Sequence, residues 1–166
     1  MNRRELGIVN RGAKRGFTLV EILIVVVLLG ILAAIVVPQF SGMAAGARRS
    51  STLEALRRIR TDIQLYKMQH DEALPAISGS NWTDLTTQKP NAKGVLCGPY
   101  MTTTPRNPMN NFSDVVTITG PDLTWGDPVA GVNIGFVFNT ETGKVLATNS
   151  NGTLVFNEDN LDDPNN

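Results

Sequence analysis

The sequence predicts an α+β protein in which a long N-terminal helical stem packs against a small antiparallel β-sheet head. Three observations support this prediction: an apolar segment near the N-terminus, an amphipathic segment after it, and several short alternating segments in the C-terminal half. The chain has 166 residues, which is enough for one domain of ordinary size with an appendage.

Charge is distributed unevenly along the chain, although the formal net charge is zero. Residues 1–16 carry five basic residues against one acid, whereas residues 71–166 carry eleven acids against four basic residues. Between them lies an arginine cluster formed by Arg48, Arg49, Arg57, Arg58 and Arg60. A chain polarised in this way is expected to place its two ends in different environments.

The first predicted element is an apolar helix that is long enough to cross a membrane. Residues 22–37 contain no polar side chain, and counting from Phe17 gives 21 residues interrupted only by Thr18 and Glu21. About 20 apolar residues span a bilayer as a helix. The thirteen Ile, Leu and Val residues contribute about −5 kcal/mol to insertion, which outweighs a cost of about +3 kcal/mol for one charge.

The flanks of this helix favour a cytoplasmic N-terminus, because basic residues directly before a span stay in the cytoplasm. Arg48 and Arg49 follow the span and weaken the contrast. The residues alone leave three interpretations open. The segment is a plain membrane anchor, an ordinary secretory signal cut at "AGA" (45–47), or a segment whose Gly-Phe junction and glutamate act together.

The stretch "RGFTLVEILIVVVLLGILAAIVVPQF" supports the third interpretation. It resembles the prepilin signature of type IV pilins and type II secretion pseudopilins: basic leader, glycine, phenylalanine, glutamate and apolar helix. The resemblance implies a pilin-like fold. It also implies cleavage after Gly16 by a membrane prepilin peptidase and methyltransferase, and methylation of the new N-terminus on Phe17. Glu21 then becomes the fifth residue of the mature chain.

Electrostatics can explain a carboxylate at position 21, at the start of the apolar segment. Cleavage leaves an α-amino group that is cationic at neutral pH, and a glutamate of the neighbouring subunit can pair with it in apolar surroundings. Thr18, Gly30 and Pro38 are further candidates for assembly. The resemblance implies that the helix near Gly30 and Pro38 loosens in the filament, whereas the plainer alternative is that Pro38 marks the end of the span.

The second predicted element is the upper stem, whose apolar residues fall on one helical face. These residues recur at spacings of three and four: Leu53, Leu56, Ile59, Ile63 and Tyr66. The arginines fall mostly on the other faces, which favours a solvated surface over nucleic-acid binding. The predicted organisation is a cleaved leader at 1–16, a transmembrane and filament-core helix at 17–37, an amphipathic stem at 38–70, a head at 71–156 and an acidic tail at 157–166.

The head is predicted from short motifs. "SNWTDLT" (80–86) is typical of a capped short helix with Trp82 as a core anchor, and strands are expected at 114–119, 133–139, 144–148 and 153–156. Turn-like links between them predict an antiparallel meander on the apolar face of the stem. "GPYMTTTPRNPMN" (98–110) predicts an ordered loop with Tyr100 buried, and it resembles a segment of major pseudopilins.

Members of the family that this loop resembles typically hold a calcium ion in a carboxylate-rich C-terminal loop. The candidates here are Asp122, Asp127, Glu158 and Asp159. They lack an EF-hand spacing, and a solvated acidic tail is the alternative. No other cofactor is expected. The chain has one histidine and one cysteine, 27 residues apart and without a supporting motif, so no enzyme activity is expected.

The predicted function is that of a structural subunit that polymerises into a helical homo-oligomeric filament, most like the major (G-type) pseudopilin of a type II secretion system. A type IV pilin or minor pilin-like protein for adhesion, motility or DNA uptake is the alternative. The resemblance implies as partners minor pseudopilins, an inner-membrane assembly platform, an outer-membrane secretin and, before assembly, membrane lipid. It implies a single-pass protein of the bacterial inner membrane with a periplasmic head, later extracted into a periplasmic or cell-surface filament.

Overall fold

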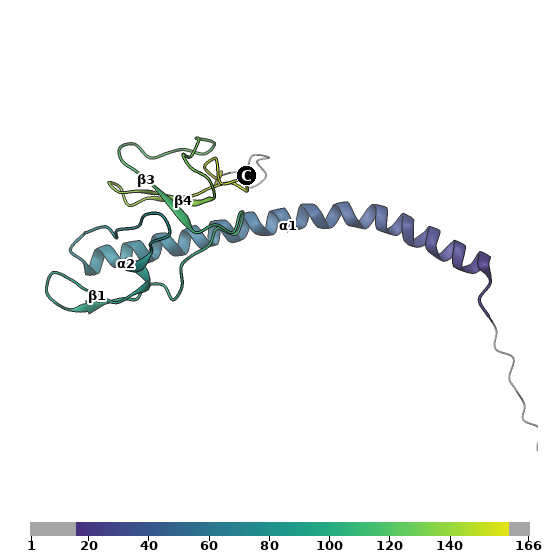
Figure 1. Cartoon of the computed structure of the whole chain (residues 1–166), viewed down its shortest axis with the longest axis horizontal. Helices are drawn as coiled ribbons and strands as arrows, with labels where there is room; N and C mark the ends of the chain where they lie inside the picture. The colour runs from purple at the N-terminus through teal and green to yellow at the C-terminus, as the bar shows by residue number, and fades with distance from the viewer. Residues whose placement is uncertain (1–15, 160–166) are drawn as a thin grey trace, which may run out of the picture. The chain divides into compact units, whose positions relative to one another are not determined.

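The computed structural model describes residues 16–159, except for the side chains of residues 38–42. The leader up to residue 15 and the tail from residue 160 therefore lie outside the described residues. Contacts divide the chain into two compact units, Met1–Ser41 and Gly42–Asn166. Helix α1 (Leu19–Gln69) contributes to both units and confirms the predicted helical stem (Figure 1).

The first unit contains the apolar part of α1. Its stretch Leu19–Val37 is long and apolar enough to cross a membrane, and none of it is buried within the chain. The large side chains here are 41% to 83% exposed. A helix that is apolar on every side requires lipid or other apolar helices around it. Pro38 lies within α1 and does not end the helix, although a proline there removes one backbone hydrogen bond and crowds the preceding turn.

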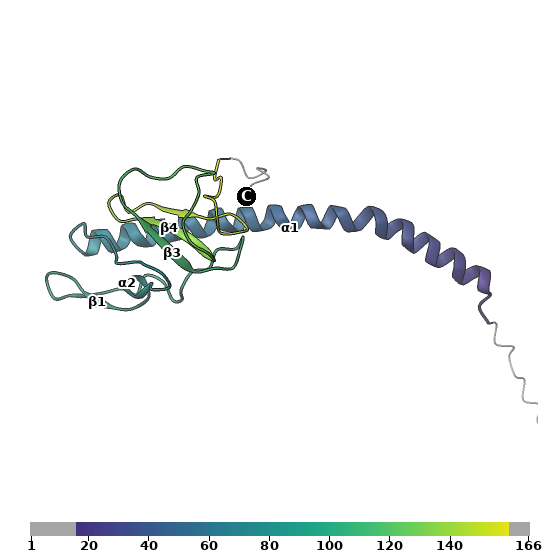
Figure 2. The same cartoon turned by 45° about the horizontal axis from the view of Figure 1, so that its top comes forward.

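The second unit is built on the upper part of α1, and its core confirms the predicted apolar face except at Leu53, which is only half-buried. Leu56, Ile59, Ile63 and Tyr66 are at most 6% exposed. They form one cluster with residues of the head, chiefly Ile77, Trp82, Leu85, Phe136, Phe138, Val145 and Phe156. Figures 1 and 2 show β3 (Asp114–Ile118) and β4 (Ile134–Asn139) lying against this part of the helix.

The main sheet has three strands in the order β3-β4-β5, with β5 at Val145–Ala147. Strands β4 and β5 are antiparallel, but β3 and β4 are parallel. The prediction of a wholly antiparallel meander is therefore wrong for this pair. The long connection at 119–133 carries the chain back across the sheet before β4 begins, as a parallel pairing requires. In place of the predicted strand at 153–156, only Leu154 and Val155 pair, each through an isolated bridge.

A small unpredicted hairpin and a short helix complete the head. Strands β1 (Lys89–Pro90) and β2 (Leu96–Cys97) pair antiparallel. Helix α2 (Thr83–Thr86) confirms the predicted short helix, but its N-cap residue, Trp82, supplies no side-chain cap. Trp82 is a core anchor as predicted: it is 2% exposed, and its indole N–H donates to Ser113 O at 2.9 Å.

Tyr100 differs from its prediction because it is half-buried. Its ring packs at the edge of the core, while its hydroxyl donates to Gln69 Oε1 at 2.8 Å. The hydroxyl needs a polar partner, and the nearest one is the exposed end of α1. The ring therefore stops short of the interior.

Candidate functional site

The first candidate site is the start of α1, where Thr18 fixes the first helical turn. Residues 16–18 are not helical, and α1 begins at Leu19. The Glu21 amide donates to Thr18 Oγ1 at 3.2 Å, and the Ile22 amide donates to Thr18 O at 3.3 Å. Threonine followed three residues later by glutamate is the spacing of a capping box. Thr18 thereby sets the helix start two residues beyond the Gly16–Phe17 bond.

The predicted cleavage bond lies in an open position. Gly16 is exposed, and Phe17 has 79% of its surface exposed. A side chain at position 16 would meet no other atom within 4 Å, so packing inside this chain does not explain the glycine. A second protein can therefore reach this bond. What the chain shows here is an accessible junction between a coil and a helix.

Glu21 is exposed in the first turn of α1. The positive end of the helix dipole favours an acid at this position. Within residues 16–159 its carboxylate forms no ion pair. A carboxylate at the edge of an apolar helix is costly in lipid unless a partner meets it. The dipole accounts for an acid near the helix start, but a partner for its charge has to come from outside this chain.

Gly30 and Pro38 lie farther along α1 and are not brought together with Glu21. At a rise of about 1.5 Å per residue, Gly30 is about 14 Å along the helix from Glu21. A Cβ atom at Gly30 would meet nothing within 4 Å, so no contact of the isolated chain requires this glycine. The side chain of Pro38 lies outside the described residues. The structure thus shows an accessible junction followed by an acid that has no ion-pair partner among residues 16–159, and a helix that continues through Gly30 and Pro38.

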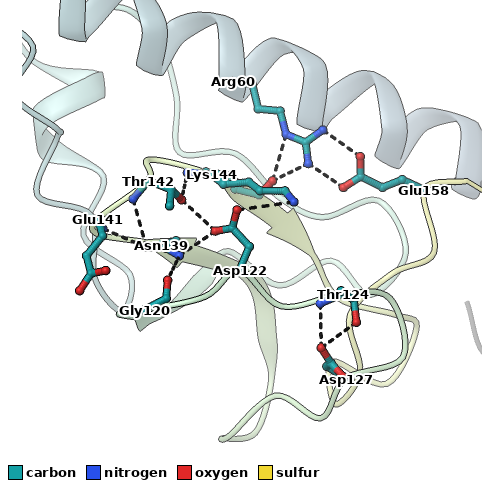
Figure 3. Close-up of polar contacts among 11 residues, drawn as sticks. Arg60, Gly120, Asp122, Thr124, Asp127, Asn139, Glu141, Thr142, Lys144 and Glu158 are labelled. Carbon is teal, nitrogen blue, oxygen red and sulfur yellow. Dashed lines mark hydrogen bonds and ion pairs between the residues drawn. The ribbon is translucent and has the colours of Figure 1, made fainter.

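The second candidate site comprises the acids proposed for calcium, and Figure 3 shows how Asp122, Asp127 and Glu158 are held. Asp122 Oδ1 accepts hydrogen bonds from Asn139 Nδ2 at 2.7 Å and Thr142 Oγ1 at 2.8 Å. Lys144 Nζ lies 3.7 Å from Asp122 Oδ2. Asp127 Oδ2 accepts from the amide and the hydroxyl of Thr124. Asp122 therefore joins the 119–133 connection to the β4–β5 turn, whereas Asp127 bonds within its own loop.

Glu158 is held from the stem. Its two carboxylate oxygens accept from Arg60 Nη1 at 2.8 Å and Arg60 Nη2 at 2.6 Å. Asp159 is exposed beside this pair. Among residues 16–159, no three His, Cys, Asp or Glu side chains gather as a metal-ligand group. Of the four predicted acids, Asp122, Asp127 and Glu158 therefore accept hydrogen bonds from donors of the protein itself, and Asp159 is exposed.

A buried asparagine was missed by the sequence reasoning, although it lies in the loop predicted to be ordered. Asn107 is fully buried, and its Nδ2 donates to Gly135 O at 2.9 Å and Thr148 O at 2.8 Å. Its Oδ1 accepts from the Met109 amide at 2.9 Å. Asn107 thus joins the proline-rich loop to the sheet. The Asn-Pro pair at 107–108 was the available signal, because asparagine readily bonds to nearby backbone.

The lone histidine and cysteine are placed in structural roles. The His70 ring stacks on Tyr66 with ring centroids 4.1 Å apart, directly after α1 ends. The Cys97 thiol is buried and donates to Val95 O at 3.5 Å. Within the described residues no hydrogen bond joins the two side chains. The arrangement offers no activated nucleophile of the Cys–His type.

Comparisons with known proteins agree with the N-terminal geometry. Residues 11–37 match the family described as "Prokaryotic N-terminal methylation motif". The chain is 30% identical to the type II secretion system core protein G of Klebsiella pneumoniae over 96 residues, which is 57% of this chain and 69% of that protein. It is 28% identical to the corresponding protein of Aeromonas hydrophila over 97 residues, covering 58% and 68%.

A second kind of relative covers more of the chain. The type IV major fimbrial protein FimA of Dichelobacter nodosus is 28% identical over 130 residues, which is 69% of this chain and 83% of that protein. No solved structure matches the chain significantly.

Proposed function

Because this chain belongs to the family of type IV pilins and type II secretion pseudopilins, and is of the G type, we propose that it is the major pseudopilin of a type II secretion system, a structural subunit that polymerises into a pilus-like filament. The observation that carries the proposal is an apolar, exposed helix that begins with an unpaired carboxylate directly after an open Gly-Phe junction. That combination suits a subunit which other subunits cover.

The first proposed step is processing at the membrane. A prepilin peptidase cleaves after Gly16, removes the basic leader and methylates the new amino group on Phe17. The open position of this bond supports the step, since a protease needs access to an extended backbone. Leader, membrane helix, stem, head and tail are then the parts of the precursor, with the boundaries given by the sequence.

The second proposed step is assembly. The amino group on Phe17 of one subunit pairs with Glu21 of its neighbour, in surroundings formed by the apolar helices. Such a pair attracts strongly where water is excluded, while each charge alone is costly there. Pairing therefore sets the axial register and draws each subunit out of the lipid. Thr18 supports the pair by fixing the helix start, and the weak stretch around Gly30 and Pro38 lets the helix loosen during packing.

The proposed location follows from the same parts. The protein spans the bacterial inner membrane once, with a cytoplasmic N-terminus and a periplasmic head, before it enters a filament that drives protein export across the outer membrane. Its proposed partners are further copies of itself, minor pseudopilins, the inner-membrane assembly platform and the outer-membrane secretin. The exposed apolar stretch Leu19–Val37 supports the membrane stage.

Mass spectrometry of the mature N-terminus tests the processing step. We expect the chain isolated from membranes to begin at Phe17 and to carry one methyl group on its amino nitrogen. A start at Arg48 would instead indicate cleavage by an ordinary signal peptidase after the "AGA" segment. A chain that retains its leader in cells with an active prepilin peptidase would refute the proposal.

Substitution of the acid tests the assembly step. Glu21→Ala should leave cleavage after Gly16 mostly intact but abolish filaments, because the new amino group loses its partner. Glu141→Ala removes an acid that is exposed in the head, and it serves as the matched control. Filaments are counted by electron microscopy of sheared material, and cleavage is followed by electrophoresis. Normal filaments from Glu21→Ala would eliminate the pairing step.

The type IV pilin alternative, for adhesion, motility or DNA uptake, is supported by the fimbrial relative, of which the chain covers 83%. Deletion of the outer-membrane secretin of the type II system separates the two functions. A pseudopilin deletion should stop export of the same proteins that a secretin deletion retains in the periplasm. Surface filaments and unchanged export would support the pilus instead.

A further inference from the structure

Three of the four acids that the family resemblance nominates for calcium, namely Asp122, Asp127 and Glu158, are already held by donors of the protein itself. Ca²⁺ takes six to eight oxygen ligands at about 2.3–2.6 Å. Here the Glu158 and Asp122 carboxylates face the cations Arg60 and Lys144, which repel a second cation. Asp127 is turned onto Thr124. In the part of the chain that the structure describes, no three His, Cys, Asp or Glu side chains gather around one point.

The guanidinium of Arg60 joins three segments that are distant in sequence. Arg60 lies on α1, and both its Nε and its Nη2 donate to Val145 O, at 3.0 Å and 2.6 Å. Its Nη1 and Nη2 also donate to the two oxygens of Glu158, in the C-terminal segment. We call Arg60, Val145 and Glu158 the Arg60 clamp. It ties the stem, the start of β5 and the C-terminal segment together (Figure 3).

The clamp is specific to arginine and partly shielded from water. A guanidinium offers a planar fork of donors that matches a carboxylate with two bonds and still reaches a carbonyl, whereas an ammonium does not. The side chains of Arg60 and Glu158 are only 32% and 22% exposed. An ion pair that is shielded and doubly hydrogen-bonded stabilises more than a fully exposed pair.

A second group of contacts fastens the connection between β3 and β4. Asn139 is 1% exposed, and its Nδ2 donates to Gly120 O at 3.0 Å as well as to Asp122. Its Oδ1 accepts from the amides of Glu141 and Thr142. This one amide side chain therefore holds the connection on one side and the β4–β5 turn on the other. All of these contacts are hydrogen bonds between protein groups, and none of them involves a metal ion.

We propose that the Arg60 clamp and the Asn139 contacts hold the loops and the C-terminal segment of the head in place, which is the role that the family resemblance gives to calcium. The head of this protein therefore folds and holds its C-terminal segment without calcium. Arg60 is the central residue, because it supplies the positive charge at the point where the stem meets the C-terminal segment. The inference rests on the geometry of the head and not on the proposed secretion function.

Calcium titration of the full chain in detergent tests the first half of this proposal. After treatment with EDTA, the thermal unfolding midpoint is measured with and without added CaCl₂, and heat of binding is measured by calorimetry. We expect midpoints within about 1 °C of each other and no stoichiometric heat, since a ligand stabilises only the state that binds it. A calcium-dependent rise of several degrees, or one ion bound per chain, would overturn the proposal.

Substitution of Arg60 tests the second half. Arg60→Lys keeps the charge but loses the fork, and we expect it to lower the midpoint in EDTA by roughly 5 °C. Arg57→Lys, on the exposed face of the same helix, is the matched control and should change the midpoint little. A double-mutant cycle of Arg60→Met with Glu158→Gln should give clearly non-additive midpoint shifts. An unchanged midpoint in Arg60→Lys, or additive shifts in the cycle, would overturn the role of the clamp.

Discussion

Two acids, Asp62 on the stem and Asp84 in the head, show how single residues respond to their surroundings. Asp62, on α1, has its pKa raised, chiefly because burial disfavours its charged form, although Arg58 lowers it in part. Its Oδ2 is buried and finds no hydrogen-bond partner among the described residues. Burial also raises the pKa of Asp84, but hydrogen bonds from Lys89 and the Ala76 amide leave that pKa lowered on balance.

The opposite shifts give opposite pH dependences. An acid whose folded pKa is raised stabilises most below its unfolded pKa, and this contribution is lost as pH rises through the folded pKa. We therefore expect Asp62→Asn to raise the unfolding midpoint at pH 7 by roughly 2 °C, and the gain to vanish toward pH about 4. The measurement is thermal unfolding of the full chain across this range. A constant gain at every pH would contradict the assignment to charge.

Asp84→Asn serves as the matched comparison. Its folded pKa is lowered, so its stabilisation is present above the unfolded pKa, near 4, and is lost as pH falls through the folded pKa. We expect Asp84→Asn to lower the midpoint at pH 7, and the deficit to shrink on acidification. If both variants shift the midpoint in the same direction, the account of these two acids is wrong.

Asn107 is expected to dominate the stability of the proline-rich loop. Asn107→Ala leaves the buried Thr148 carbonyl and the Met109 amide without a partner and removes one of the hydrogen bonds to Gly135 O, at a cost of about 3 kcal/mol. Asn151→Ala, at an exposed position, should stay within roughly 0.5 kcal/mol of the original chain. Urea unfolding of the full chain provides both values. Equal effects of the two substitutions would show that the amide is not the central contact.

At the residue scale, the sequence predicts the candidates of the N-terminus but not the polar contacts of the head. Gly16, Phe17 and Glu21 were identifiable because their motif is local and contiguous. The role of Arg60 was not, because its carboxylate partner lies 98 residues away. The same holds for Asn107, whose carbonyl partners belong to strands distant in the chain.

At the scale of elements, the spacing of apolar residues in the sequence was sufficient to predict the helices but not the pairing of the strands. The apolar face of the stem was correct because spacings of three and four are decided within a few residues. Alternation found β3 and β4, but it carries no information on direction, which the long connection between them decides. The hairpin β1–β2 was missed because its strands have two residues each.

The apolar part of α1 yields a prediction about its weak point. Gly30→Ala strengthens the isolated helix by about 1 kcal/mol, and the chain itself has room for the methyl group. If loosening near Gly30 is part of assembly, this variant should be processed normally but form fewer filaments. Gly46→Ala, at an equally open position in α1, is the control. Filaments as abundant as those of the original chain would show that loosening is not required there.

At the scale of the whole molecule, the chain divides into an apolar unit and a folded head, and these should face different compartments. In a Cys97→Ser background, we expect Asn151→Cys in the head to react with a membrane-impermeant maleimide in intact spheroplasts. A cysteine at Asn10 in the leader, in cells without prepilin peptidase, should react only after lysis. The reverse pattern would invert the proposed topology.

The position of Thr18 has a mechanical consequence for the proposed filament. A cut after Gly16 leaves only Phe17 and Thr18 ahead of a helix whose first turn Thr18 already clamps. The new N-terminus is therefore not joined to the helix by a flexible segment, and it reaches Glu21 of the neighbouring subunit in a defined position. It is held by the helical segment that runs from Thr18 toward Gly30, so this segment sets its direction, and little conformational entropy of the N-terminus remains to be lost when it binds Glu21 of the neighbour.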